Sequence, residues 1–134
     1  MDTIVEGSPY RRCAERSFEP EPASVGLARR FLTAQLVTWG GNALVDSSQL
    51  VVSELASNAY QHAGTVFTVV AEMLGDGALR LGVSDAVLDI PKQRPAGEDD
   101  LRGRGIVLVE ALSRAWGVDL RGDGKTVWCE LEPD

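Results

Sequence analysis

Apolar and polar positions change their spacing several times along the chain, and each change marks a predicted element. From Ser24 the apolar residues recur at helical spacing until Gly40–Gly41, which predicts a helix over residues 24–39 with Ser24 as its N-cap. Asp46–Ser47–Ser48–Gln49 has the form of a capping box and opens a second helix. That helix is expected to run to about Ala63, where a glycine follows.

Strand spacing follows the second helix. Residues 66–74 and 78–84 are apolar or alternating, and Gly75–Asp76–Gly77 between them predicts a hairpin turn. Residues 106–116 return to helical spacing, and residues 118–120 and 126–131 predict a last hairpin.

Two stretches fit neither spacing. The polar residues 1–22 form either a frayed N-terminal arm or an edge strand around Arg16–Phe18. Residues 86–104 are rich in proline, glycine and acidic residues, and so long a connection in a small domain is typical of a binding loop or lid. The element order predicts an α+β fold over residues 23–134, a two-layer α/β sandwich with helices packed on one face of a mixed, mostly antiparallel sheet.

The charge and apolar content of the chain limit the classes of molecule that it is expected to bind. The 134 residues carry a net charge of −7 and 44% are apolar, with a sequence pI near 4.7. Binding a nucleic-acid backbone requires clustered cations, so this balance disfavours direct nucleic-acid binding. No apolar run approaches the roughly 20 residues that span a bilayer, and the N-terminus lacks a secretory apolar segment. Two cysteines, Cys13 and Cys129, make neither a disulfide framework nor a metal motif, so we expect a cytoplasmic protein without membrane association.

The second helix carries the most informative side chains. At 100° per residue Glu54, Asn58 and His62 fall on one ridge, four residues apart, in or beside the apolar stripe. This ridge is either a solvated edge of the stripe with an internally bonded glutamate, or the wall of a cavity that holds a cation or a polar ligand. In the second case Glu54 could act as a base or metal ligand, and Asn58 as a neutral oxygen ligand for magnesium.

Two glycine runs approximate known phosphate motifs without matching them. Gly103–Arg104–Gly105 begins a helix, where backbone N–H groups could approach an anion, but Leu108 occupies the third glycine position of a dinucleotide fingerprint. Gly124–Lys125–Thr126 looks like the end of a P-loop, yet Asp119 stands where the first glycine is required. Asp85, at the end of its strand, is either a turn former or an acceptor for an exocyclic amine.

Taken together these segments resemble the histidine-kinase-like ATPase (Bergerat-fold) superfamily, and within it the bacterial anti-sigma-factor serine kinases. Residues 51–63 match the N box, and Val83–Ser84–Asp85 the first glycine-box position. Gly103–Arg104–Gly105–Ile106 matches the second glycine box, and residues 124–128 the final one. The similarity spans about residues 24–131. It departs from the pattern after Asp85, where Ala86–Val87–Leu88–Asp89 lacks the two glycines of larger members.

The resemblance implies a function and a set of site residues. The family's cofactor is ATP with magnesium; Asn58 would ligate the metal, and Glu54 would be the general base. Asp85 would read the adenine amino group, with Thr126 beside it. Gly103, Arg104 and Gly105 would shape the phosphate lid, and His62 would support the end of the N-box helix.

The resemblance also implies partners. The chain would be an anti-sigma factor and protein serine/threonine kinase that acts in transcription regulation. It would phosphorylate an anti-anti-sigma (STAS-type) protein, alternatively bind a sigma factor, and could form a homodimer. The alternative is a nucleotide-gated protein-binding regulator without significant kinase activity. Arg29 and Arg30 lie off the apolar stripe of the first helix, where they face either solvent or an acidic partner.

Overall fold

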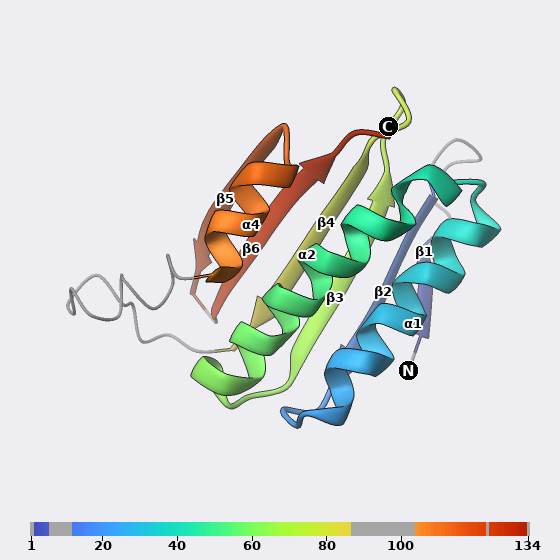
Figure 1. Cartoon of the computed structure of the whole chain (residues 1–134). Coiled ribbons are helices and arrows are strands. Elements are labelled where there is room, and N and C mark those ends of the chain that lie inside the picture. Colours follow the sequence, from blue (N-terminus) through green and yellow to red (C-terminus); the bar gives the residue numbers. More distant parts are fainter. Residues whose placement is uncertain (1, 6–11, 87–103, 123, 134) are drawn as a thin grey trace.

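A computed structural model of the chain describes residues 2–5, 12–86, 104–122 and 124–133. Within these residues six strands form one sheet in the order β1-β2-β3-β4-β6-β5. Helices α1, α2 and α4 lie on one face of that sheet (Figure 1). The predicted two-layer α+β sandwich is therefore confirmed. The sequence predicts a mixed sheet, but every strand pair among the described residues is antiparallel.

The N-terminal segment is part of the sheet. β1 (Asp2–Val5) pairs with β2 (Arg12–Phe18), and β2 also pairs with β3 (Phe67–Met73). Of the two interpretations left open for residues 1–22, a strand is the one observed around Arg16–Phe18. It lies inside the sheet, however, while β1 forms the edge.

Helix α1 (Ala23–Thr38) begins one residue earlier than predicted. Pro22 is the N-cap and already has helical backbone angles, φ −58° and ψ −36°, and no side chain caps the helix. Ser24 therefore lies within the first turn, where it is buried, and its assignment as N-cap is wrong.

The second helix begins and ends in irregular turns. A short 3-10 turn, η1 (Asn42–Leu44), leads into α2 (Val45–Asn58), which continues as a π-helical turn, η2 (Ala59–Ala63). Gly64 ends it with a left-handed φ of 68°, a conformation that favours glycine, so the predicted end is confirmed.

The predicted capping box is wrong, because its side chains make other hydrogen bonds. The Ser47 and Ser48 hydroxyls donate to main-chain carbonyls one turn earlier, and the helix has no side-chain cap. Gln49 does not reach back to its own N-terminus; its amide donates to Thr33 Oγ1 on α1 at 2.8 Å. This bond joins α1 to α2.

The C-terminal half forms the centre and the other edge of the sheet. β4 (Leu79–Asp85) follows the predicted hairpin turn, closed by a 2.8 Å bond from Leu74 N–H to the Ala78 carbonyl. The later elements are α4 (Arg104–Leu112), β5 (Ala115–Arg121) and β6 (Gly124–Leu131). The helix predicted to reach residue 116 ends at Leu112, because Arg114 N–H already donates to the Glu130 carbonyl of β6.

The core lies between the helices and the sheet. Helix residues such as Leu32, Leu36 and Val52 meet strand residues such as Phe67 and Leu81, all of them fully buried. The opposite face of the sheet carries no helix among the described residues (Figure 1). None of the described helices combines the length and apolar character needed to cross a membrane.

Candidate functional site

The predicted site segments meet at one end of the molecule. The last turns of α2, the end of β4, the start of β6 and the start of α4 lie there together (Figure 1). β4 and β6 run antiparallel, so the last residue of one strand, Asp85, pairs with Lys125 near the start of the other. Residues 87–103, which contain most of the predicted lid, lie outside the described residues.

Glu54 and Asn58 lie one turn apart on α2, beside its buried stripe of Val51, Val52 and Leu55. Both side chains are half-buried. Among the residues that the structure describes, neither makes a side-chain hydrogen bond or ion pair. A partly desolvated carboxylate is unfavourable for stability unless it is paired, and a ligand in front of Glu54 stays a prediction.

His62 lies four residues after Asn58. It belongs to the π-helical turn η2 and is exposed. A π-helical turn contains more residues than an α-helical turn, so the rotation of 100° per residue no longer applies beyond Asn58. The placement of His62 on the ridge of Glu54 and Asn58 stays a prediction.

Asp85 lies at the end of β4 on the face that carries the helices. Its side chain is only 6% exposed, and its Oδ2 accepts a 2.9 Å hydrogen bond from Nζ of Lys125, whose side chain is 15% exposed. The ends of β4 and β6 thus bring a nearly buried charge pair to the same end of the molecule as Asn58.

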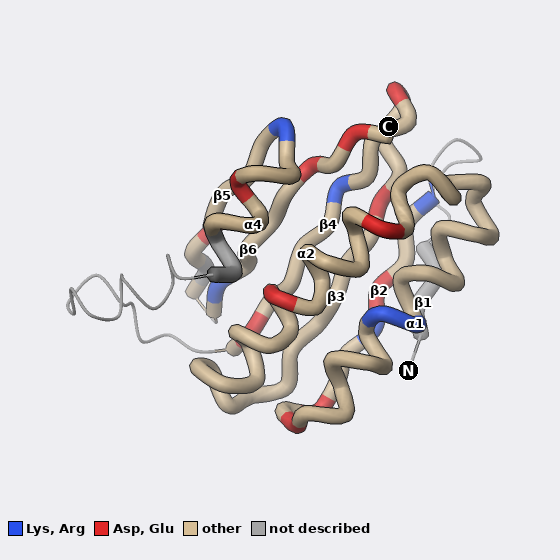
Figure 2. Tube along the Cα trace, in the orientation of Figure 1, with Lys and Arg blue, Asp and Glu red and all other residues tan. Residues whose placement is uncertain are grey.

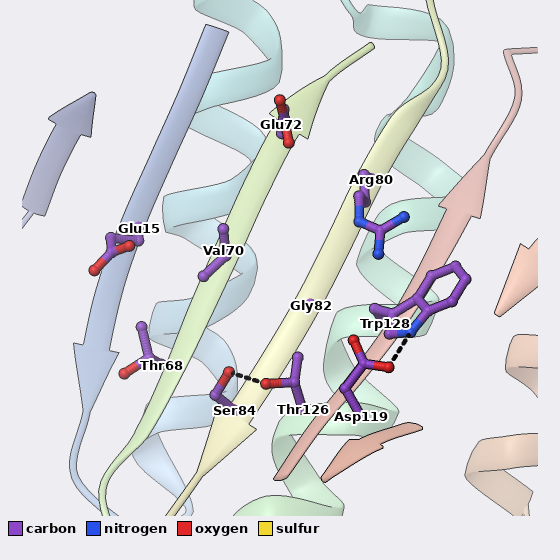
Figure 3. A pocket seen from close by; sticks show the side chains of 10 residues that line it. All are labelled: Glu15, Thr68, Val70, Glu72, Arg80, Gly82, Ser84, Asp119, Thr126 and Trp128. Carbon is purple, nitrogen blue, oxygen red and sulfur yellow. Dashed lines mark hydrogen bonds between the residues drawn. The ribbon is translucent and has the colours of Figure 1, made fainter. Parts of the chain in front are cut away.

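Thr126 lies on the opposite face of the sheet. Its hydroxyl is 2.7 Å from that of Ser84, and Figure 3 shows both side chains on the face away from the helices. Side chains alternate between faces along a strand, so the residue directly opposite Asp85 in the ladder is Lys125. Thr126 lines the same cavity as Asp85 at the strand ends, and its role beside Asp85 stays a prediction.

Gly124 explains why β4 and β6 approach so closely here. Its φ is +152°, and a Cβ at this position would overlap the carbonyl oxygen of Asp85 and lie 2.9 Å from its carbonyl carbon. A side chain is thus excluded by backbone atoms, which cannot move aside as a flexible side chain can. The final glycine of the motif has a steric role in setting the Asp85–Lys125 register.

The structure describes only some of the residues that are predicted to shape the phosphate lid. Arg104 and Gly105 begin α4, as the motif predicts, and Gly103 lies outside the described residues. Helix α4 packs against α2, so its N-terminus belongs to the same end of the molecule as Asn58. A helix N-terminus favours negative charge, which suits a phosphate.

Two cavities border the helix-free face. One of about 450 Å³ lies over Gly82, between Val70 and Trp128 (Figure 3). The other, of about 310 Å³, lies at the strand ends, where Asp85, Gly124 and Lys125 contribute to its wall. Glu54 and Asn58 line neither of these two cavities.

Lys125 is the neighbour of Asp85 that the sequence does not single out. It belongs to the run 124–128 that resembles the final glycine box, but the resemblance gives a role only to Thr126. The signal that identifies it is the register of β4 against β6, which a single sequence does not reveal.

Charges elsewhere do not suggest a nucleic-acid surface. Figure 2 shows basic residues singly or in pairs along the described elements, interspersed with acidic ones. Within the described ranges, no three His, Cys, Asp or Glu side chains gather into a group that could hold a metal.

Comparison with known proteins fits this geometry. The model of the histidine kinase-like ATPase domain matches residues 18–131. The chain belongs to the histidine kinase-like ATPase family.

The similarity to individual proteins covers only part of the length of each. An uncharacterized protein of Streptomyces coelicolor, SCO4941, is 42% identical over 69 residues, which cover 50% of this chain and 66% of that protein. The structure of the RsbU and RsbW domains of Rv1364c from Mycobacterium tuberculosis aligns with a TM-score of 0.64 and 20% identity, covering 89% of this chain and 32% of that one. The histidine kinase domain of the blue-light activated histidine kinase of Erythrobacter litoralis EL346 aligns with a TM-score of 0.55 and 18% identity. The alignment covers 81% of this chain and 61% of that one. The two structures share the fold of this ATPase domain.

Proposed function

We propose that this protein binds magnesium-ATP and acts as a regulatory anti-sigma factor with serine-protein kinase activity toward an anti-anti-sigma protein. The observation that carries the proposal is the half-buried Glu54–Asn58 pair on α2, at the end of the molecule where Asp85 ends β4. The family match supports nucleotide binding. The RsbU and RsbW domains of Rv1364c share the fold, and partner switching with a sigma factor and a STAS-type protein is what the sequence resemblance to the anti-sigma-factor kinases implies.

The residues present fit a magnesium-bound nucleotide. The Asn58 side chain offers a neutral oxygen, and magnesium in such sites takes few protein ligands, completing its shell with phosphates and water. The bound ion would neutralise the phosphate charge. The N-terminus of α4 adds a favourable dipole on the phosphate side.

Glu54 is the group placed to act on the phosphate acceptor. It lies one turn before Asn58 on the same helix, so a hydroxyl brought to the outermost phosphate would come within its reach. As a carboxylate it would accept the proton of the attacking serine hydroxyl while oxygen bonds to phosphorus and the nucleoside diphosphate leaves. Positioning and charge neutralisation supply the rest of the barrier reduction.

The experiment compares wild type with Glu54→Gln, using γ-labelled ATP and a panel of STAS-domain proteins from the same genome. Glu54→Gln retains the shape and removes the base. It is expected to bind ATP with unchanged affinity and to transfer phosphate at least 100-fold more slowly. Transfer at the wild-type rate would refute the base assignment.

The same assay separates the kinase from the binding regulator. A regulator without kinase activity would bind nucleotide and a partner, yet leave every STAS-domain protein unlabelled with wild type. Labelled serine in one partner, lost in Glu54→Gln, supports the kinase.

A further inference from the structure

Lys125 and Asp85 form a nearly buried ion pair. Their side chains are 15% and 6% exposed, and the ammonium lies 2.9 Å from the carboxylate. Both project from the sheet toward the helices, so they face the layer in which α2 carries Glu54 and Asn58. Resemblance implies a role for Asp85 alone, and the lysine has no assigned function.

The strand register holds the two charged groups in place. Asp85 pairs with Lys125 across the ladder, and Ser84 pairs with Thr126 through a 2.7 Å hydroxyl bond on the opposite face. Gly124 allows the two backbones to touch. The Ala86 N–H donates to Thr65 Oγ1 at 3.3 Å, which ties the end of β4 to the segment after η2. A donor and an acceptor are thus presented side by side from fixed backbone.

We infer that Lys125 is a specificity-determining residue for the nucleotide base. The inference rests on the proposed function, because it assumes that ATP places its base at Asp85. Lys125 donates a hydrogen bond to ring nitrogen N1 of adenine, while Asp85 accepts one from the exocyclic N6 amine.

The chemistry of the two groups matches that edge of adenine. The pairing edge of adenine carries a donor, N6–H, next to an acceptor, N1. An ammonium has three N–H donors, so the bond to Asp85 uses one, and a carboxylate can accept about four hydrogen bonds. The ion pair therefore persists while both groups bind the base. A 6-oxo purine reverses this order, because it carries an acceptor at position 6 and an N1–H donor at position 1. Its acceptor would then face the Asp85 carboxylate, and its donor would face the Lys125 ammonium.

Two ATP analogues separate the two contacts. 1-Deaza-ATP lacks the N1 acceptor and reports on Lys125, whereas purine riboside triphosphate lacks the N6 amine and reports on Asp85. Affinities for ATP and both analogues are measured by calorimetry with magnesium, for wild type and Lys125→Met. Arg80→Met is the matched control, because Arg80 lies on the helix-free face against Trp128.

Wild type and Arg80→Met are expected to bind ATP at least about tenfold more tightly than 1-deaza-ATP, the loss typical of one hydrogen bond from a charged donor. In Lys125→Met the ratio of the affinity for ATP to the affinity for 1-deaza-ATP falls to about two or less, while the preference for ATP over purine riboside triphosphate remains. An undiminished 1-deaza ratio in Lys125→Met would overturn the inference. Tighter ATP binding by Lys125→Met would also overturn it, because the lysine would then compete with the base for Asp85.

If Lys125→Met does not fold, the same affinities are measured for Lys125→Gln. Glutamine keeps a neutral donor, so its 1-deaza ratio is expected between those of wild type and Lys125→Met; a ratio equal to wild type would count against a charged contact. Wild-type protein that binds no ATP at all would overturn the proposed function itself. Wild-type protein that binds ATP and 1-deaza-ATP equally would overturn only the assignment of Lys125.

Discussion

Replacing Gly124 by alanine tests the register that brings Asp85 to Lys125. Gly124 has a φ of +152°, and an added Cβ would overlap the Asp85 carbonyl oxygen and lie 3.0 Å from Cα of Ala86. All of these are backbone atoms, so the ends of β4 and β6 must separate to accept the methyl group. The backbone conformation costs about 1–3 kcal/mol for a residue with a Cβ, and the overpacking about as much again.

The expected loss in the free energy of unfolding is therefore about 2–6 kcal/mol, a large fraction of the roughly 5–15 kcal/mol of a typical domain. Urea denaturation followed by tryptophan fluorescence measures it. Two other glycines serve as controls that separate the cost of the backbone conformation from the cost of overpacking. Gly77 has a φ of +89° with open space around it, so Gly77→Ala should cost about 1–2 kcal/mol. Gly75 has open space and no positive φ, so Gly75→Ala should be neutral or stabilising by up to about 1 kcal/mol.

The order of the three variants is the critical result. Gly124→Ala should be the least stable, Gly77→Ala intermediate and Gly75→Ala closest to wild type. If Gly124→Ala unfolds within about 0.5 kcal/mol of wild type, the close approach of the two strands is wrong, and the Asp85–Lys125 pairing loses its support.

Three further predictions concern the rest of the fold. Phe67→Ala should lower the free energy of unfolding by about 3–5 kcal/mol in urea, because Phe67 is fully buried and stacks on Phe18 at 5.5 Å; a loss below about 1 kcal/mol would contradict this packing. Burial raises the pKa of the Cys129 thiol from 9.0 to about 11, so its contribution to stability is complete below pH 9 and is lost as the pH rises toward 11; Cys129→Val should lack this alkaline loss in thermal melts, and equal losses in both proteins would refute it. The Arg114 guanidinium lowers the pKa of Asp76 from its ordinary 3.8, so that pair stabilises the fold above pH 3.8 and less as the pH falls; the melting temperatures of wild type and Arg114→Ala should converge in acid, and a constant difference would argue against the ion pair.

Much of the fold can be predicted from the sequence because the apolar residues recur at regular helical or strand spacing. The amphipathic stripe of α1 and the hairpin at Gly75–Asp76–Gly77 are local patterns, and both lie where the sequence predicts them. Element ends were less predictable. Trp116 continues the apolar helical pattern, but pairing with β6 places it in β5 opposite Cys129, a long-range contact that the pattern does not contain.

The site divides in the same way. An α-helix holds Glu54 and Asn58 one turn apart, as their spacing predicts, whereas the change to a π-helical turn after Asn58 cannot be read from the sequence. Thr126 was assigned beside Asp85 without knowledge of the register between two strands some forty residues apart, where a shift of one residue moves a side chain to the other face. The register places Lys125 directly opposite Asp85, while Thr126 lines the same cavity as Asp85 at the strand ends.

The central claim is that Asn58, with Glu54 beside it, faces a magnesium-bound nucleotide. Its most direct test is a calorimetric titration of ATP into wild type and Asn58→Ala, each with and without magnesium. The account predicts that magnesium strengthens ATP binding by wild type at least tenfold, and that Asn58→Ala loses this dependence while its melting temperature stays close to that of wild type. An equal effect of magnesium on both proteins would contradict it.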